Sequence, residues 1–124
     1  MKPLNVVVAQ SDAHYAERLA ASLYNHFRSV AVARSSEELR DSIPKHRADL
    51  AIVDLELVNL DEIEDLHRRF EDTTIVCTHR VPDEEMWASA LAAGASDICQ
   101  SADVNKVVNS ALRSLGVFAA SQAA

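Results

Sequence analysis

A carboxylate stands where an apolar stretch ends in the middle of the chain. Residues 48–57 read ADLAIVDLEL, so a run of aliphatic residues closes on Asp54, and Glu56 follows two positions later. A charge at the end of such a run is typical of a buried parallel strand. Ligands of open α/β sheets bind at the carboxyl ends of the strands, and this places Asp54 at a candidate site.

The segment after Asp54 is unusually apolar for a loop beside such a site. It contains four aliphatic residues, Leu55, Leu57, Val58 and Leu60. Glu56 and Asp61 supply further carboxylates within the same segment. Whether these acids form a working site depends on the residues that end the neighbouring strands.

Charge and composition exclude several classes of partner. The net charge is −7 over 124 residues, whereas nucleic-acid surfaces need clustered Lys and Arg, so we expect no nucleic acid to bind this domain. No apolar run approaches the roughly 20 residues of a membrane span. The opening residues MKPL lead into an apolar run without the pattern of a secretory signal. These features predict a cytoplasmic domain with no membrane contact.

The cysteines and histidines show no metal-binding pattern. Cys77 and Cys99 lie in separate apolar runs and lack the spacing of a zinc or redox motif, so we expect buried free thiols. The five histidines are scattered and form no ligand set. Tyr15 and Tyr24 are interpreted as surface residues of an amphipathic helix.

Strand-like and helical patterns alternate along the chain. Short apolar runs predict strands at residues 5–9, 29–33, 73–78 and 96–100, in addition to the central strand that ends at Asp54 within residues 48–57. Apolar residues at helical spacing predict a helix after each strand, the last one ending before Gly116. Helix starts are expected at Ser11 or Asp12, at Ser35 with Glu38 as a capping box, at Asp61 and at Pro82, and Pro44 is expected to end the second helix.

This alternation predicts an α/β fold with a five-stranded parallel sheet, doubly wound as (βα)5 with helices on both faces. The flavodoxin-like strand order 2-1-3-4-5 places a crevice between the first and third strands. Gln10, Ser11 and Asp12 would then lie beside Asp54. We expect one domain over residues 1–116, with residues 117–124 as a tail or the start of a linker.

With these elements in place, the sequence resembles the receiver domain of bacterial two-component response regulators over nearly its whole length. Residues 49–57, DLAIVDLEL, are similar to the strand that ends in the family's phosphoacceptor aspartate, here Asp54. Thr78 matches the hydroxyl residue that ends the fourth strand and contacts the phosphoryl group, and residues 93–96, AGAS, match the motif before the fifth strand.

The resemblance implies phosphorelay signal transduction rather than enzymatic activity. It also implies a histidine kinase or another signalling protein as partner, and it allows a homodimer that pairs through the last helices. Phosphoryl transfer to a carboxylate brings two anions together, so the family uses magnesium, an acid pair and a lysine to neutralise the charge.

The sequence departs from the family pattern at four of these functional positions. Gln10 and Ser11 stand where the family has its acid pair, and Ser101 stands where it has its lysine. Ile98 replaces the aromatic residue whose rotamer reports phosphorylation. The resemblance therefore implies either a weak magnesium site or no metal.

The residues that remain for such a weak site are Asp54, Asp12 and Glu56. Asp12 lies one position past the acid pair and is better explained as a helix cap. The Glu56 side chain would partly replace the missing acid, or it is an exposed loop residue. Magnesium prefers charged oxygen ligands, which Gln10 and Ser11 do not provide.

Three functions are compatible with these residues. The first is a receiver phosphorylated at Asp54. The second is a pseudo-receiver that acts as a protein-interaction module without phosphorylation. The third, a carboxylate-dependent phosphatase that uses Asp54 and Glu56 as a pair, is weakly supported because the sequence lacks the lysine and further acids that such enzymes need.

Overall fold

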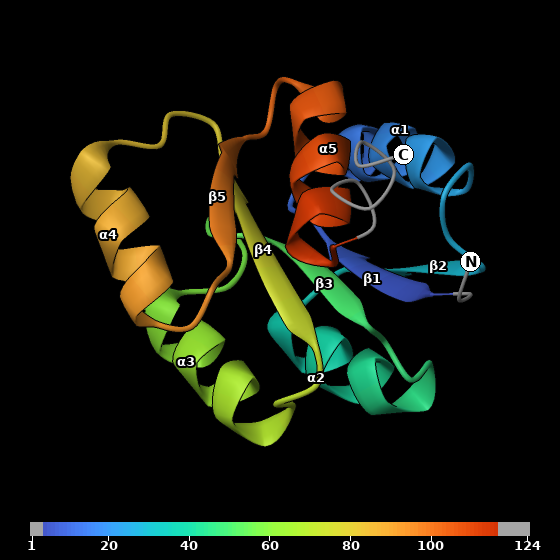
Figure 1. Ribbon diagram of the computed structural model, residues 1–124, viewed down its shortest axis with the longest axis horizontal. Coiled ribbons are helices and arrows are strands. Elements are labelled where there is room, and N and C mark those ends of the chain that lie inside the picture. The colour runs from blue at the N-terminus through green and yellow to red at the C-terminus, as the bar shows by residue number, and fades with distance from the viewer. Residues whose placement is uncertain (1–3, 117–124) are drawn as a thin grey trace.

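The computed structural model describes residues 4–116, which form a parallel sheet with helices on both faces (Figure 1). Its elements follow in the order β1 Asn5–Ala9, α1 Ala13–Leu23, β2 Ser29–Ala33, α2 Ser36–Lys45, β3 Leu50–Asp54, α3 Leu60–Arg69, β4 Thr74–His79, α4 Glu84–Ala92, β5 Asp97–Gln100 and α5 Val104–Ser114. The sheet order is β2-β1-β3-β4-β5. This confirms the predicted five-stranded, doubly wound fold.

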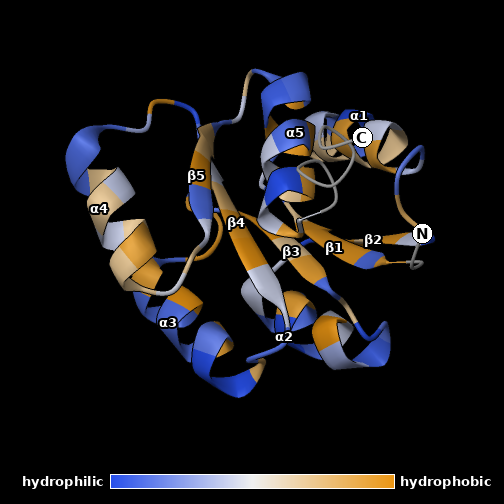
Figure 2. Cartoon of the chain, in the orientation of Figure 1, coloured by the Kyte–Doolittle hydropathy of each residue, from blue (hydrophilic) through white to orange (hydrophobic). Residues whose placement is uncertain are grey.

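Each of the central strands is buried on both faces. Alternate residues of β1 and β3 divide between two apolar cores: Val7, Ala51 and Val53 lie in one, and Val8 and Ile52 lie in the other. Helices α1 and α5 cover the second core, and α2, α3 and α4 cover the first. Figure 2 shows the resulting apolar sheet between helices whose outer faces, apart from that of α4, are largely polar.

Side-chain caps fix where the helices start. Asp12 and Ser35 accept hydrogen bonds from the Tyr15 and Glu38 amides, as the sequence predicts. The predicted start of α3 at Asp61 is wrong, because Asn59 caps the helix and Leu60 begins it. A short polar side chain provides the cap in each of these helices, and in α2 and α3 acidic residues follow in the first turn.

The predicted end of the second helix at Pro44 is correct to within one residue, whereas the predicted place of Pro82 in a first helical turn is wrong. Pro82 precedes α4, whose cap is Asp83, rather than lying in the first helical turn. Pro44 lies within the last turn of α2, which ends at Lys45. Pro44 has no amide hydrogen to donate to the carbonyl four residues earlier, and α2 ends one residue after it.

Three other predictions concern the cysteines, membrane-spanning segments and the end of the chain. Cys77 and Cys99 are both free thiols, as expected, but only Cys77 is fully buried, whereas Cys99 is partly exposed. Within residues 4–116, every helix is too short to cross a bilayer as an apolar segment. The predicted tail, residues 117–124, lies outside the described residues.

Candidate functional site

The sheet brings three polar side chains to one level at the carboxyl ends of its central strands. Asp54 ends β3 and is aligned with Thr78 of β4. Ala9 is aligned with Val53, so Gln10 follows β1 at the level of Asp54. All three are buried, with exposures of 5% for Gln10, 6% for Asp54 and 0% for Thr78. Parallel pairing therefore creates the predicted crevice edge around Asp54.

Both carboxylate oxygens of Asp54 accept hydrogen bonds from the protein. Oδ2 accepts from the Ser11 amide at 3.0 Å and from the Ser11 hydroxyl at 2.6 Å. Oδ1 accepts from the Glu56 amide at 2.8 Å. Bonds to a charged acceptor are short and strong, so these donors hold the carboxylate in one orientation. Ser11 occupies a family acid position, and here it donates to Asp54 instead of repelling it.

Thr78 is held by Gln10 rather than left free beside Asp54. The Gln10 amide nitrogen lies 3.1 Å from the Thr78 hydroxyl, and that hydroxyl lies 3.3 Å from the Gln10 carbonyl oxygen. Both side chains are buried, so breaking this pair would leave unsatisfied polar groups. Thr78, which would have to contact a phosphoryl group on Asp54, is therefore already hydrogen-bonded to Gln10.

Glu56 turns its carboxylate towards the end of β4. Its Oε1 lies 2.7 Å from the Arg80 Nε and 3.9 Å from the His79 Nε2. The bond to Glu56 holds the pKa of the Arg80 guanidinium above its usual range. The Glu56 side chain is thus neutralised by an arginine.

Asp12 also has a local role. It caps α1 through the Tyr15 amide at 3.1 Å, and this bond is the main reason that the pKa of Asp12 is lowered. At the family's lysine position, the Ser101 amide donates to the His79 carbonyl at 2.9 Å. Ile98 is 7% exposed and packs in the core, whereas a reporter side chain would need to reach the surface.

A cavity of about 310 Å³ opens beside Asp54. Its lining includes two arginines that the sequence did not single out, Arg18 of α1 and Arg80 after β4. Tyr15 also lines it, and the prediction of a surface tyrosine is wrong because the residue is only 7% exposed. Tyr15 and Arg18 are three positions apart on α1, a spacing that places them on one face; the guanidinium lies 5.6 Å from the ring centre.

The donor set does not fit magnesium. Magnesium needs open oxygen ligands in octahedral geometry, usually from carboxylates and water. Asp54 accepts three protein bonds, Asp12 caps a helix and Glu56 pairs with Arg80. Within residues 4–116, no group of three or more acidic, histidine or cysteine side chains is placed to share a metal ion. The three predicted ligands, Asp54, Asp12 and Glu56, line the same cavity, but they are not arranged to coordinate one metal ion.

No family model and no curated protein matches the sequence. Solved structures do match: the beryllofluoride-activated receiver domain of DrrB has a TM-score of 0.81 at 14% identity, and covers 93% of this chain and 99% of that one. A response regulator from Thermotoga maritima has a TM-score of 0.81 at 17% identity, with 95% and 99% covered. The chain has the fold of a response regulator receiver domain.

A longer neighbour shares this fold. The response regulator RcsB from Salmonella typhimurium has a TM-score of 0.83 at 19% identity, and covers 94% of this chain but only 61% of that one. In RcsB, the matching fold is thus part of a longer chain. Identities this low establish the architecture, whereas function has to be argued from the site.

Proposed function

We propose that this chain is a two-component signalling module of the pseudo-receiver type, which binds signalling proteins without phosphoryl transfer to Asp54. The observation that carries this proposal is that three protein hydrogen bonds occupy both oxygens of the Asp54 carboxylate. Attack through Oδ2 would have to break the 2.6 Å bond to the Ser11 hydroxyl, and Oδ1 is held by the Glu56 amide. The reaction would also proceed without the family's lysine, whose position is occupied by Ser101, to neutralise the developing charge.

The second candidate is a receiver that is phosphorylated at Asp54 by a histidine kinase, with Thr78 contacting the phosphoryl group. One specific feature favours it. Arg18 and Arg80 line the cavity beside Asp54, so positive charge is present at the crevice. Arg80 is already paired with Glu56, however, which reduces the charge that it can offer to a phosphoryl group. Pairing of two copies through the last helices stays a prediction in either case.

A phosphoryl mimic separates these two candidates. Magnesium and then beryllofluoride would be titrated into the protein while Trp87 fluorescence and the amide NMR shifts of Ser11, Asp54 and Thr78 are followed. The DrrB receiver domain, which beryllofluoride activates, is the positive control. We expect no saturable change in this chain. Saturable shifts that disappear in Asp54→Asn would overturn the pseudo-receiver and establish the phosphorylated receiver.

A further inference from the structure

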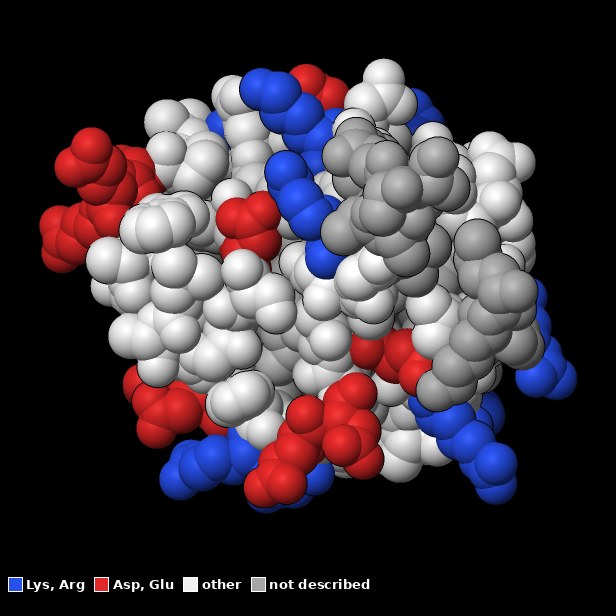
Figure 3. All heavy atoms as spheres, viewed as in Figure 1, with Lys and Arg blue, Asp and Glu red and all other residues white. Residues whose placement is uncertain are grey.

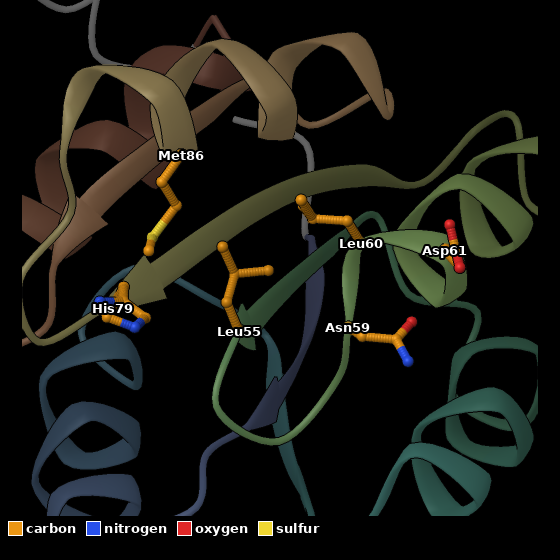
Figure 4. A pocket seen from close by; sticks show the side chains of 6 residues that line it. All are labelled: Leu55, Asn59, Leu60, Asp61, His79 and Met86. Carbon is orange, nitrogen blue, oxygen red and sulfur yellow. The ribbon is translucent and has the colours of Figure 1, made fainter.

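The apolar loop after Asp54 forms one wall of a cavity that the proposed function leaves unused. This cavity, of about 430 Å³, is lined by Leu55, Asn59, Leu60, Asp61, His79 and Met86. In Figure 4, Met86 points towards Leu55 and His79, and Leu60 reaches into the same space, while Asn59 and Asp61 lie to one side. The floor is therefore aliphatic, and its polar residues lie at the margin.

The cavity exists because α3 and α4 approach each other unevenly. Beyond the carboxyl end of α4, Gly94 packs so tightly on His67 of α3 that a Cβ on Gly94 would lie 2.4 Å from the ring. At the amino ends, the cavity separates Leu60 from Met86. We call this opening the α3–α4 groove.

Helix α4 is more apolar than its packing requires. Its sequence is EEMWASALA, yet Ala90 is its one buried residue. Figure 2 shows the apolar character extending around this helix, unlike the two-sided pattern of α3. Apolar surface of this kind, beside a cavity and rimmed by polar residues, is typical of protein interaction sites.

Acidic side chains surround the groove. Glu84 and Glu85 lie in the first turn of α4, and Asp61 lies in the first turn of α3. Glu64 is four residues after Leu60 and three before His67, so it lies on the side of α3 that faces α4. Figure 3 shows a patch of acidic side chains over the amino-terminal end of α4.

These four acids differ from other acids of the same helices in having no cation nearby. Glu62 pairs with Arg40, and Asp65 pairs with Arg69. Within residues 4–116, Asp61, Glu64, Glu84 and Glu85 lie beyond ion-pair distance of every basic side chain. First-turn acids favour helix formation, so their charge alone would not define a site. Together with an aliphatic cavity, they indicate a binding partner that carries both apolar and basic side chains.

We infer that the α3–α4 groove binds a basic amphipathic helix of a partner protein, which inserts aliphatic side chains between Leu55, Leu60 and Met86. Lysines or arginines flanking those side chains meet the acidic rim. This is the helix-in-groove mode, in which apolar anchors at i, i+3 or i+4 provide affinity and surrounding charges provide specificity. The inference rests on the proposed function and adds the chemistry of the partner to it.

The test uses a synthetic helix with leucines at i, i+3, i+4 and i+7 and lysines elsewhere. Binding is followed by amide NMR shifts of the full chain, and a peptide with glutamate in place of lysine is the charge control. We expect saturable shifts centred on Leu55, Leu60 and Met86 with the lysine peptide alone. Shifts spread evenly over the surface would overturn the inference.

Charge-matched variants decide whether the rim is specific. Glu84→Lys with Glu85→Lys is expected to weaken binding about tenfold through like-charge repulsion. Glu37→Lys with Glu38→Lys makes the same change in the first turn of α2, so it has the same net charge and a similar cost to its helix. We expect less than about a twofold effect there. Equal weakening by both pairs would mean non-specific attraction and would reject the groove.

The apolar wall has its own pair of variants. Met86→Gln should weaken binding of the lysine peptide, whereas Met86→Leu should leave binding unchanged, because only the glutamine removes apolar contact. Full retention in Met86→Gln would contradict the insertion of side chains. Beryllofluoride is added to the same samples. A saturable response would refute the phosphorylation-independent function, while peptide failure without such a response would refute the groove alone.

Discussion

At the scale of single residues, Ser11 and Asp54 determine the character of the site. A short bond from a hydroxyl to a buried carboxylate is stabilising, and its loss leaves that carboxylate with fewer donors. The two remaining donors are the backbone amides of Ser11 and Glu56. Ser11 is thus part of the structural support of Asp54.

Ser11→Ala removes the 2.6 Å bond to Asp54 and is expected to lower the free energy of unfolding by about 1–3 kcal/mol at neutral pH. Urea unfolding monitored by circular dichroism measures the change. Ser22→Ala in α1 is the control, and it should be neutral or slightly stabilising because alanine favours helix. A Ser11→Ala variant as stable as the parent protein would show that the bond contributes nothing to folding.

Tyr15 carries the opposite kind of hydroxyl, one without a hydrogen-bond partner among the described residues. Tyr15→Phe should therefore be stabilising by about 1 kcal/mol, since it removes an unpaired buried polar group. Tyr24 is 60% exposed and donates to the Val30 carbonyl, so Tyr24→Phe is the matched control and should be close to neutral. Destabilisation by Tyr15→Phe would imply a partner for its hydroxyl.

Alkaline pH gives a second measure of Tyr15. Burial raises the pKa of Tyr15 from 10.0 to about 12, so the unfolded chain loses this proton first. The stability is fully present below pH 10 and is lost as pH rises towards about 12. Tyr15→Phe should flatten that decline in urea unfolding measured across this range. Burial also raises the pKa of Cys77 from 9.0 to about 12, which causes a second loss of stability with rising pH. This loss begins near pH 9 and should persist in Tyr15→Phe.

At the scale of elements, the contact between α3 and the segment after α4 depends on one glycine. Gly94 has φ +110°, a conformation that side chains rarely adopt, and a Cβ there would meet the His67 ring at 2.4 Å. Gly116 also has positive φ, +80°, but within residues 4–116 no atom lies within 4 Å of where its Cβ would be. A side chain at either glycine would strain the backbone, but only a side chain at Gly94 would also clash with a neighbour.

Gly94→Ala is expected to lower the free energy of unfolding by about 2–5 kcal/mol, the sum of strain and overpacking. Gly116→Ala should cost only about 1–2 kcal/mol, because strain acts alone. Thermal or urea unfolding of both variants measures the difference. His67→Ala in the Gly94→Ala background should recover the steric part. Equal costs at the two glycines would contradict tight packing on His67.

Element positions followed from the sequence more reliably than element ends. The strand at Asn5–Ala9 and the cap at Ser35 were predicted correctly, because apolar periodicity and capping spacing are local signals. The start of α3 was missed because Asn59 and Asp61 are both good caps, and the choice depends on how the loop leaves β3. Tyr15 was misplaced for a similar reason, since α5 covers it.

At the scale of the whole molecule, the sequence predicted which strand ends meet but not how their side chains pair. The parallel order brings Gln10, Asp54 and Thr78 to one level, as alternating strands and helices implied. The Gln10–Thr78 pair and the Glu56–Arg80 pair join residues 68 and 24 positions apart, so no local pattern contains them. Long-range polar pairing is fixed by the assembled sheet.

The same assembly predicts that the phosphoryl-transfer chemistry can be rebuilt on this fold. Gln10→Glu, Ser11→Asp and Ser101→Lys restore acids and an ammonium at the positions where the receiver resemblance places them. Replacing Ser11 also removes the hydroxyl bond to Asp54 Oδ2, while the backbone amide of residue 11 can still donate to that oxygen. Carboxylates there would supply charged oxygens for a divalent cation, and the ammonium would neutralise the phosphoryl group.

The triple variant is therefore expected to show a saturable, magnesium-dependent response to beryllofluoride, with amide shifts near Asp54 and Thr78, while the parent chain shows none. Adding Asp54→Asn should abolish the response, which ties it to this carboxylate. Acids introduced beside Asp54 also repel it, so stability should fall in metal-free solution and recover on adding magnesium. A folded triple variant without any magnesium response would mean that the loop around Glu56, and not the substituted residues, prevents metal binding.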